Sequence, residues 1–153
     1  MQHTIRVAVD YRQFYLWDPT VTNRAPEEYS DLDIERRVKL APSVVVVQPE
    51  RDGAVDVVVD LADADPGFTA AACDHVVECS IDVPGGRLRV HECLGSATLD
   101  ITVDPGVYAV RVLFTGLDSI DEDGLGGEDR YVVQLWPAGR RSLVVVKQWL
   151  DAG

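Results

Sequence analysis

The sequence predicts an all-β fold, an antiparallel β-sandwich of about eight or nine strands, with closure into a β-barrel as the alternative. Short apolar segments rich in valine, isoleucine and aromatic residues recur along the chain, and clusters of Gly, Pro and Asp separate them. Helical periodicity is nearly absent. A chain of 153 residues is long enough to bury one sizeable core. We therefore expect a single β-sandwich domain spanning residues 1–153.

Residues 4–17 are expected to form one long first strand. Alternation places its first four apolar residues on one face: Ile5, Val7, Val9 and Tyr11. The alternation then changes parity near Arg12 and Gln13, which indicates a β-bulge or bend at that point.

The next part of the chain alternates between loops and strands. Residues 18–42 are polar and are expected to form a long loop, in which Ser30 caps a short helix that extends to Val38. The valine run at 43–48 lacks alternation, which is typical of a strand buried on both faces. Residues 54–61 alternate again and form a further strand.

In the second half, residues 73–83 and 87–94 are expected to pair as a β-hairpin. A two-residue turn at Gly85 and Gly86 would place Val83 opposite Leu88. The remaining strands are expected at residues 97–103, 107–114, 131–136 and 143–150.

The chain is strongly acidic, with 14 Lys and Arg residues against 26 Asp and Glu residues and a formal net charge of −12. This charge opposes binding to nucleic acid, which needs local basic residues, and it favours basic partners. Salt-adapted proteins share such a surface, so charge alone identifies no partner. The sequence shows no signal peptide and no apolar run near the ~18 residues of a membrane span. Three cysteines without framework spacing indicate reduced thiols, so we expect a cytoplasmic protein.

The cysteine and histidine residues of the middle segments resemble a metal site: Cys73, His75, Cys79, His91 and Cys93. On one strand, however, His75 and Cys79 would lie about 13 Å apart. The expected hairpin would also place Cys93 on the other face of the sheet from Cys79. Because a tetrahedral zinc shell cannot form across a sheet, we predict neither a metal nor a cofactor.

No catalytic motif is present. The sequence contains no Gly-x-Ser-x-Gly elbow, no P-loop and no His-Glu-x-x-His motif. Cys73 and His75 would lie side by side on one strand without a third group to orient them. We therefore predict that the protein is not an enzyme.

The most conspicuous segment is an acidic loop before residue 130. Its carboxylates are Asp118, Asp121, Glu122, Asp123, Glu128 and Asp129. An EF-hand alignment with Gly124 at position 6 places Ser119 at position 1 and Arg130 at position 12, so it fails at both ends. A looser calcium site and a merely solvated loop stay open. The third interpretation is a protein-binding loop, in which the carboxylates meet a basic partner and Tyr131 anchors the contact.

Several strand-and-turn patterns follow one another in a characteristic order. They lie at residues 9–14, 30–35, 53–61, 73–83, 86–90, 99–101, 105–108 and 129–131. In this order and spacing, nearly the whole chain resembles the competence-protein-J family. Residues 121–127 and 136–149 depart from the family pattern and are similar to uncharacterised relatives that end in Leu-Trp-Pro…Lys-Gln-Trp.

The resemblance implies an inhibitor of a DNA-entry nuclease, without catalytic residues of its own. We therefore expect a basic protein partner such as a nuclease or toxin, bound by the loop carboxylates and Tyr131. Nucleic acid and membranes are not expected partners, and a homodimer is left open. The alternatives are a calcium- or small-ligand-binding β-sandwich, and a structural subunit if the valine run proves to be an exposed edge.

Overall fold

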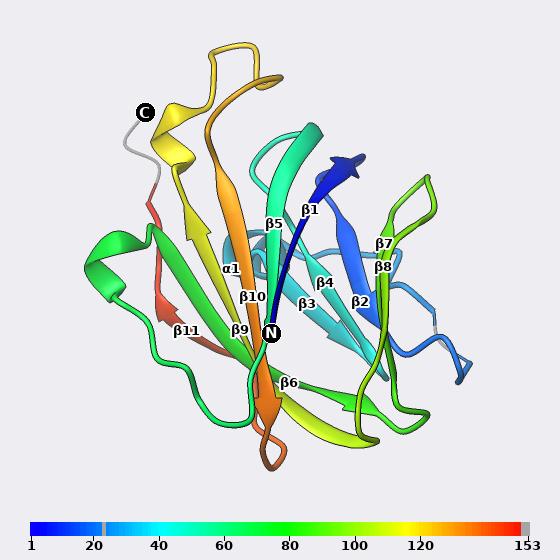
Figure 1. Cartoon of the computed structure of the whole chain (residues 1–153). Coiled ribbons are helices and arrows are strands. Elements are labelled where there is room, and N and C mark those ends of the chain that lie inside the picture. The colour runs from blue at the N-terminus through cyan, green and yellow to red at the C-terminus, as the bar shows by residue number, and fades with distance from the viewer. Residues whose placement is uncertain (23, 151–153) are drawn as a thin grey trace.

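The structure is a computed structural model that describes residues 1–22 and 24–150. Two β-sheets pack face to face, and their strands do not close into a barrel (Figure 1). The predicted all-β sandwich is therefore confirmed. The described residues form eleven strands in place of the eight or nine expected. None of their helices is long and apolar enough to cross a membrane.

The first sheet has six strands in the order β1, β5, β10, β9, β6 and β11. Neighbouring strands are antiparallel except for β5 and β10, which run parallel. The bounds are β1 Gln2–Val9, β5 Gly53–Leu61, β10 Arg130–Pro137, β9 Gly106–Thr115, β6 His75–Val83 and β11 Val144–Lys147.

The second sheet has five antiparallel strands in the order β3, β4, β2, β7 and β8. Two 3-10 turns, η1 Ala70–Ala72 and η2 Leu117–Ser119, lie in connections. The bounds of the five strands are β3 Val38–Ala41, β4 Val44–Val47, β2 Phe14–Trp17, β7 Arg87–Glu92 and β8 Ala97–Thr102.

The expected short helix is present as α1, Asp31–Arg36. Ser30 accepts a hydrogen bond from the Asp33 backbone N–H, and the Asp33 carboxylate accepts one from Ser30 N–H, which forms a complete capping box. The helix ends earlier than expected, because Arg37 adopts a left-handed conformation with φ 62°. The expected loop over 18–42 is therefore wrong at its end, where Val38 begins strand β3.

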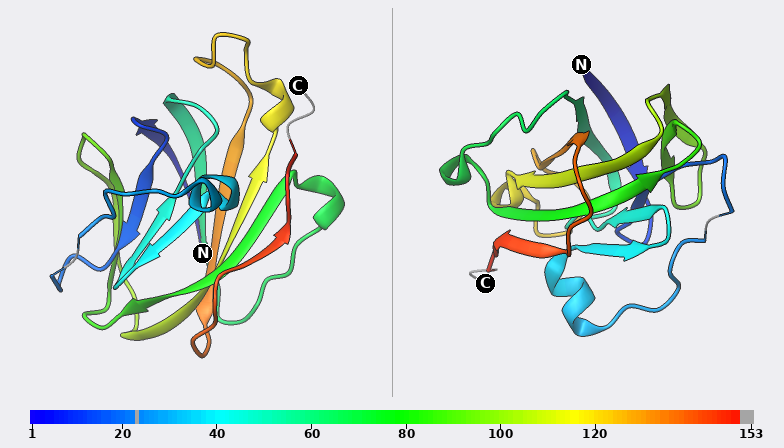
Figure 2. Two further views of the ribbon diagram at one scale, coloured as in Figure 1. Left: turned by 180° about the vertical axis from the view of Figure 1, so that it is seen from behind. Right: turned by 90° about the horizontal axis from the view of Figure 1, so that it is seen from below.

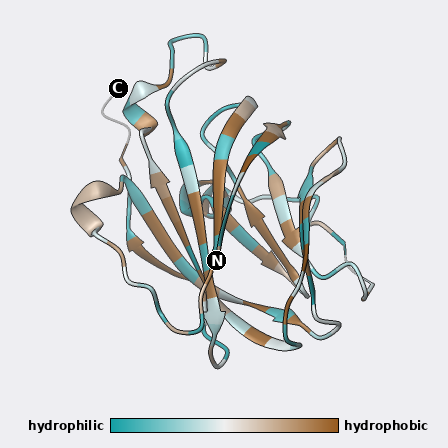
Figure 3. Cartoon of the chain, viewed as in Figure 1, coloured by the Kyte–Doolittle hydropathy of each residue, from teal (hydrophilic) through white to brown (hydrophobic). Residues whose placement is uncertain are grey.

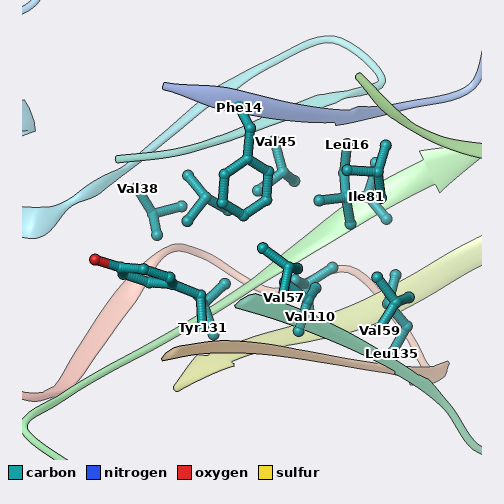
Figure 4. Packing of buried hydrophobic residues seen from close by; sticks show 14 of the residues in the cluster. Phe14, Leu16, Val38, Val45, Val57, Val59, Ile81, Val110, Tyr131 and Leu135 are labelled. Atoms are coloured by element: carbon teal, nitrogen blue, oxygen red, sulfur yellow. The ribbon is translucent and has the colours of Figure 1, made fainter. Parts of the chain in front are cut away.

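The core lies between the two sheets and consists mainly of valine. In Figure 4, Phe14 and Leu16 of β2 face Val57 and Val59 of β5 across the space between the sheets. Hydrophobic and hydrophilic residues alternate along many of the strands (Figure 3). Full burial of a Val, Leu or Phe side chain contributes about 1.5–3 kcal/mol relative to exposure, so this layer is the main stabilising part of the fold.

The valine run is buried on both faces, as its lack of alternation predicts. Val45 and Val47 face the main core, whereas Val44 and Val46 pack with Tyr29 under the segment that follows β2. Strand β4 lies between β3 and β2. It is not an exposed edge, which removes the reason for considering a structural subunit.

The expected single strand over 4–17 is wrong, since β1 and β2 belong to different sheets. Tyr11 and Arg12 both have positive φ, at 55° and 53°, and Gln13 N–H donates to the Asp10 carbonyl at 3.2 Å. Two consecutive left-handed residues form a tight turn. The change of parity therefore marks the crossing from one sheet to the other, and Tyr11 is exposed on the turn.

The expected hairpin around Gly85 is also wrong. Val83 pairs with β9 in the six-stranded sheet, whereas Leu88 pairs with β8 in the five-stranded sheet. Gly85 N–H donates to Asp18 Oδ2 at 2.7 Å, and a Cβ at this position would lie 1.6 Å from Thr20 Oγ1. Contact with the segment after β2 thus fixes a turn that carries the chain between sheets.

Arg111 organises the outer face of the six-stranded sheet. Its guanidinium binds both oxygens of Asp65, at 2.7 and 2.9 Å, and Glu78 at 2.8 Å. It also donates to Gln134 at 3.0 Å and lies over the Phe68 ring at 4.5 Å. These contacts hold the connection 62–72 against the sheet.

Asp65 gives the fold a predicted pH dependence. Hydrogen bonds from Arg111 lower the pKa of Asp65 to about 2, compared with about 3.9 in an unfolded chain. Its stabilisation is therefore complete above pH 4 and is lost as the pH falls toward 2. Because Asp65 is half exposed, Asp65→Asn should lower the free energy of unfolding at pH 7 by only about 0.5–1 kcal/mol. Urea unfolding across this pH range measures the effect.

The matched control is Asp63→Asn. Asp63 lies on the same connection and makes no ion pair or side-chain hydrogen bond among the described residues. Its substitution should leave the free energy of unfolding within about 0.5 kcal/mol of wild type. A deficit of Asp65→Asn that stayed constant from pH 7 to pH 2 would contradict the assignment.

Candidate functional site

The acidic loop connects β9 to β10 and projects from one end of the sandwich, at the top of Figure 1. Five of its predicted carboxylates are exposed: Asp118, Asp121, Glu122, Asp123 and Glu128. Within the described part of the chain, none of these five forms an ion pair. The loop therefore presents negative charge that forms no ion pair with a basic residue of the described chain.

Backbone and side-chain hydrogen bonds order the loop from within. Asp121 N–H donates to the Gly126 carbonyl at 2.8 Å, and Glu128 N–H donates to Ser119 Oγ at 2.7 Å. At the neck, Gly116 has φ 69°, and a Cβ there would lie 2.6 Å from the Glu128 carbonyl oxygen. Glycine thus allows the two ends of the loop to approach closely.

The other two predicted partner-binding residues, Asp129 and Tyr131, are buried beneath the loop. Arg51 Nε donates to one oxygen of Asp129 at 2.7 Å, and the Tyr131 hydroxyl donates to the other at 2.6 Å. The same hydroxyl accepts from Glu50 N–H at 3.1 Å, and Arg51 Nη1 donates to the Leu125 carbonyl at 3.3 Å. Asp129 and Tyr131, together with Arg51, therefore support the loop from the interior of the sandwich.

Burial and the neighbouring carboxylate of Asp129 raise the pKa of Tyr131. The phenol therefore keeps its proton and remains a hydrogen-bond donor to Asp129. Its ring meets Phe114 edge to face at 5.4 Å, which fixes the phenol in the core. Figure 4 shows the hydroxyl directed away from Val57 and Val110.

A hollow of about 300 Å³ lies between the acidic loop and the C-terminal segment. Its lining includes Asp118 and Asp121 from the loop, Glu50 and Arg12 from turns, and Trp149 after β11. Two sequence-predicted carboxylates thus share a cavity with residues that are distant in the sequence.

Trp149 is held at this hollow by a buried histidine. His75 Nε2–H donates to the Arg36 carbonyl at 2.8 Å, and its Nδ1 accepts from Trp149 N–H at 3.1 Å. Burial lowers the pKa of His75, which favours the neutral ring that this arrangement requires. The Arg37 guanidinium lies over the Trp149 ring at 5.0 Å.

The cysteine and histidine residues do not come together, because β6 and β7 belong to different sheets and do not form the predicted hairpin. His75 and Cys79 belong to β6, His91 belongs to β7 in the opposite sheet, and Cys73 and Cys93 lie just outside these strands. Among the described residues, no group of three His, Cys, Asp or Glu side chains is placed to hold a metal ion.

The thiols are also poorly suited to nucleophilic chemistry. Burial raises the pKa of Cys73 and raises that of Cys79 to about 12, and a protonated thiol is a weak nucleophile. Cys93 accepts a hydrogen bond from the Tyr15 hydroxyl at 3.1 Å. What this end of the sandwich presents is charge and shape, in the exposed loop and in the hollow beside it.

Sequence reasoning missed three residues of this site: Glu50, Arg51 and Trp149. Glu50 and Arg51 lie in a turn that looked like an ordinary polar connection. The one available signal was a basic residue within an acidic chain, next to a strand end. Nothing local indicates that Arg51 reaches Asp129, 78 positions away.

The solved structures contain similar folds. No family model matches the chain, and none of the curated proteins matches it in sequence. The crystal structure of ComJ from Bacillus subtilis, an inhibitor of the DNA degrading activity of NucA, aligns with a TM-score of 0.71 and 13% identity over 89% of this chain and 96% of ComJ.

A second similar structure is the product of crocagin biosynthetic gene J. It aligns with a TM-score of 0.59 and 22% identity, over 91% of this chain and 99% of that protein. Both alignments cover nearly the whole sandwich. The chain therefore has the fold of ComJ, and its resemblance to the competence-protein-J family is confirmed at the level of the fold.

Proposed function

We propose that this protein is a non-enzymatic inhibitor that binds and blocks a basic nuclease or toxin in the cytoplasm. Its fold is that of a nuclease inhibitor, ComJ. Three free cysteines, Cys73, Cys79 and Cys93, support a reducing compartment.

The observation that carries the proposal is the set of unpaired carboxylates on the acidic loop. Several acidic residues elsewhere form ion pairs within the protein, as Asp65 does with Arg111 and Asp100 does with Arg87 and Arg89. The loop instead concentrates its charge at one end of the sandwich, where hydrogen bonds hold it in shape. Such a preformed surface lowers the entropic cost of association.

A nuclease that grips DNA needs a positively charged surface, because phosphate binding depends on local Lys and Arg. Carboxylates that enter such a cleft occupy the position of the phosphates and compete with DNA. The net charge of −12 adds long-range attraction to the same target. Inhibition on this basis is stoichiometric and requires no chemistry from the inhibitor.

The test is to immobilise the protein, pass a lysate of its own host over it, and assay the bound fraction for degradation of DNA. We expect a bound DNA-degrading enzyme whose activity is restored by high salt and suppressed again by one equivalent of free protein. NucA from Bacillus subtilis is a second target for the same assay. Unimpeded degradation of DNA at an excess of the protein, with host enzymes and NucA alike, would rule out the proposal.

Neutralising the loop should slow association with the target. In Asp118→Asn/Asp121→Asn/Glu122→Gln, the replaced side chains make no hydrogen bond among the described residues, so the loop keeps its shape. We expect an association rate at low salt that is lower by roughly tenfold, and a weaker dependence on salt. Stopped-flow mixing with the recovered enzyme measures both.

The control variant removes three charges from the opposite end of the sandwich. Asp60→Asn/Asp63→Asn/Asp104→Asn has the same net charge as the loop variant, and these side chains also make no ion pair or hydrogen bond within residues 1–22 and 24–150. Its association rate should fall by less than about threefold, because the charges lie more than a Debye length from the loop. If both variants slowed association equally, the electrostatic acceleration of binding would come from the net charge of the protein and not from the loop.

Tyr131→Phe should destabilise the base of the loop. The variant leaves one oxygen of Asp129 and the Glu50 N–H without the partner that the hydroxyl supplies. Loss of hydrogen bonds to buried groups costs about 1–3 kcal/mol, which urea unfolding would register. Inhibition should also weaken, since the loop loses its support.

Tyr108→Phe is the matched control for this effect. The Tyr108 hydroxyl donates to the Asp104 carbonyl at 2.6 Å, at the end of the sandwich remote from the loop. Its loss should reduce stability and leave inhibition unchanged. The role given to Tyr131 would be contradicted if the two variants weakened inhibition equally.

A further inference from the structure

Beside the acidic loop, a strained turn exposes an aromatic side chain. Tyr11 is 72% exposed, and its φ of 55° lies in the left-handed region, which is uncommon for a bulky residue. Gly or Asn would adopt this conformation with less strain. The fold therefore keeps a large exposed ring where a smaller residue would be more stable. Backbone strain of this kind concentrates at functional sites.

The Tyr11 turn and the acidic loop are fixed to the same connection. Arg12 N–H donates to Asp52 Oδ1 at 2.7 Å. The preceding residue, Arg51, binds Asp129 and the Leu125 carbonyl of the loop. The segment between β4 and β5 thus sets the position of both features at the same end of the sandwich (Figure 1).

Apolar and aromatic groups accompany the carboxylates at this end. Leu125 at the tip of the loop is 69% exposed, and Trp149 lines the hollow that Arg12 shares with Asp118. Aromatic residues surrounded by a polar rim are typical of the energetic centre of a protein interface. Tyrosine suits this role because its ring covers a large area and loses little conformational entropy on binding.

We infer that Tyr11 is an aromatic anchor for the inhibited nuclease, an inference that rests on the proposed function. Charge complementarity selects the occupant, because the adjoining carboxylates attract a basic surface. The Tyr11 ring then packs against an apolar patch at the edge of that surface and is desolvated. The loop carboxylates thereby set the rate of association, and Tyr11 sets the lifetime of the complex.

The experiment compares Tyr11→Asn and Tyr11→Phe with wild type, using the DNA-degrading enzyme recovered in the binding assay. For Tyr11→Asn we expect a Kd about 10–100-fold higher, because the complex should dissociate faster. The same variant should have a Tm higher by about 2–4 °C, because Asn relieves the strain. Tyr11→Phe should keep both wild-type values. Val144→Asn removes an exposed apolar residue from the edge strand β11 and should leave Kd unchanged.

The possible failures are distinguishable. An unchanged Kd for Tyr11→Asn, with an inhibited enzyme in hand, would overturn the anchor and leave the proposed function intact. Weaker binding together with a lower Tm would reduce Tyr11 to a structural role and would also overturn the inference. If wild type inhibits neither a host DNA-degrading enzyme nor NucA, the proposed function and the anchor fail together.

Discussion

The buried ion pair between Arg51 and Asp129 is the contact on which the end of the molecule that carries the acidic loop depends. It joins the β4–β5 connection to the first residue before β10, and Tyr131 completes the hydrogen bonds of the carboxylate. Removing one partner of such a pair leaves an uncompensated buried charge, at a cost of about 3–5 kcal/mol. Two opposite charges are therefore buried, and their ion pair holds the exposed acidic loop in place.

The pair lies where the chain crosses from one sheet to the other. Arg51 belongs to the connection from β4 of the five-stranded sheet to β5 of the six-stranded sheet, and Asp129 precedes β10, the neighbour of β5. Asp52, the next residue, accepts from the turn that leads into β2. The short β4–β5 connection therefore holds together the end of the sandwich that carries the acidic loop, the hollow and the Tyr11 turn.

The distribution of unpaired charge over the molecule follows from the ion pairs that its arginines form. Arg111 and Arg51 are buried and fully used in binding carboxylates and carbonyls. Several other basic residues pair with acidic neighbours on the surface, as Arg6 does with Asp56. Part of the excess of acid over base lies on the acidic loop, whose exposed carboxylates form no ion pair with the described basic residues. Figure 2 shows this loop projecting from one end of the sandwich. A surface of this kind suits recognition of a positively charged macromolecule.

Two of the errors of sequence reasoning share one cause. The sequence predicts a bend near Tyr11 and a turn at Gly85, and it assigns the strands on both sides of each to a single sheet. In a sandwich, a tight turn can return a strand to its neighbour or pass it to the facing sheet. The hydrophobic pattern does not separate the two cases, because both sheets direct one face toward a common core and a bulge within one strand changes the parity as a crossing does.

The sequence by itself determined most of the strands apart from β3, the cap of α1 at Ser30, the double burial of Val44–Val47 and the acidity of the loop. These features depend on the period of the hydrophobic pattern and on the chemistry of adjacent residues. Only the tertiary structure decided which strands share a sheet, that Asp129 and Tyr131 lie inside, and that Tyr11 lies outside. Those outcomes depend on contacts between residues up to 81 positions apart. Neither periodicity nor local spacing reports which distant side chain completes a buried hydrogen bond.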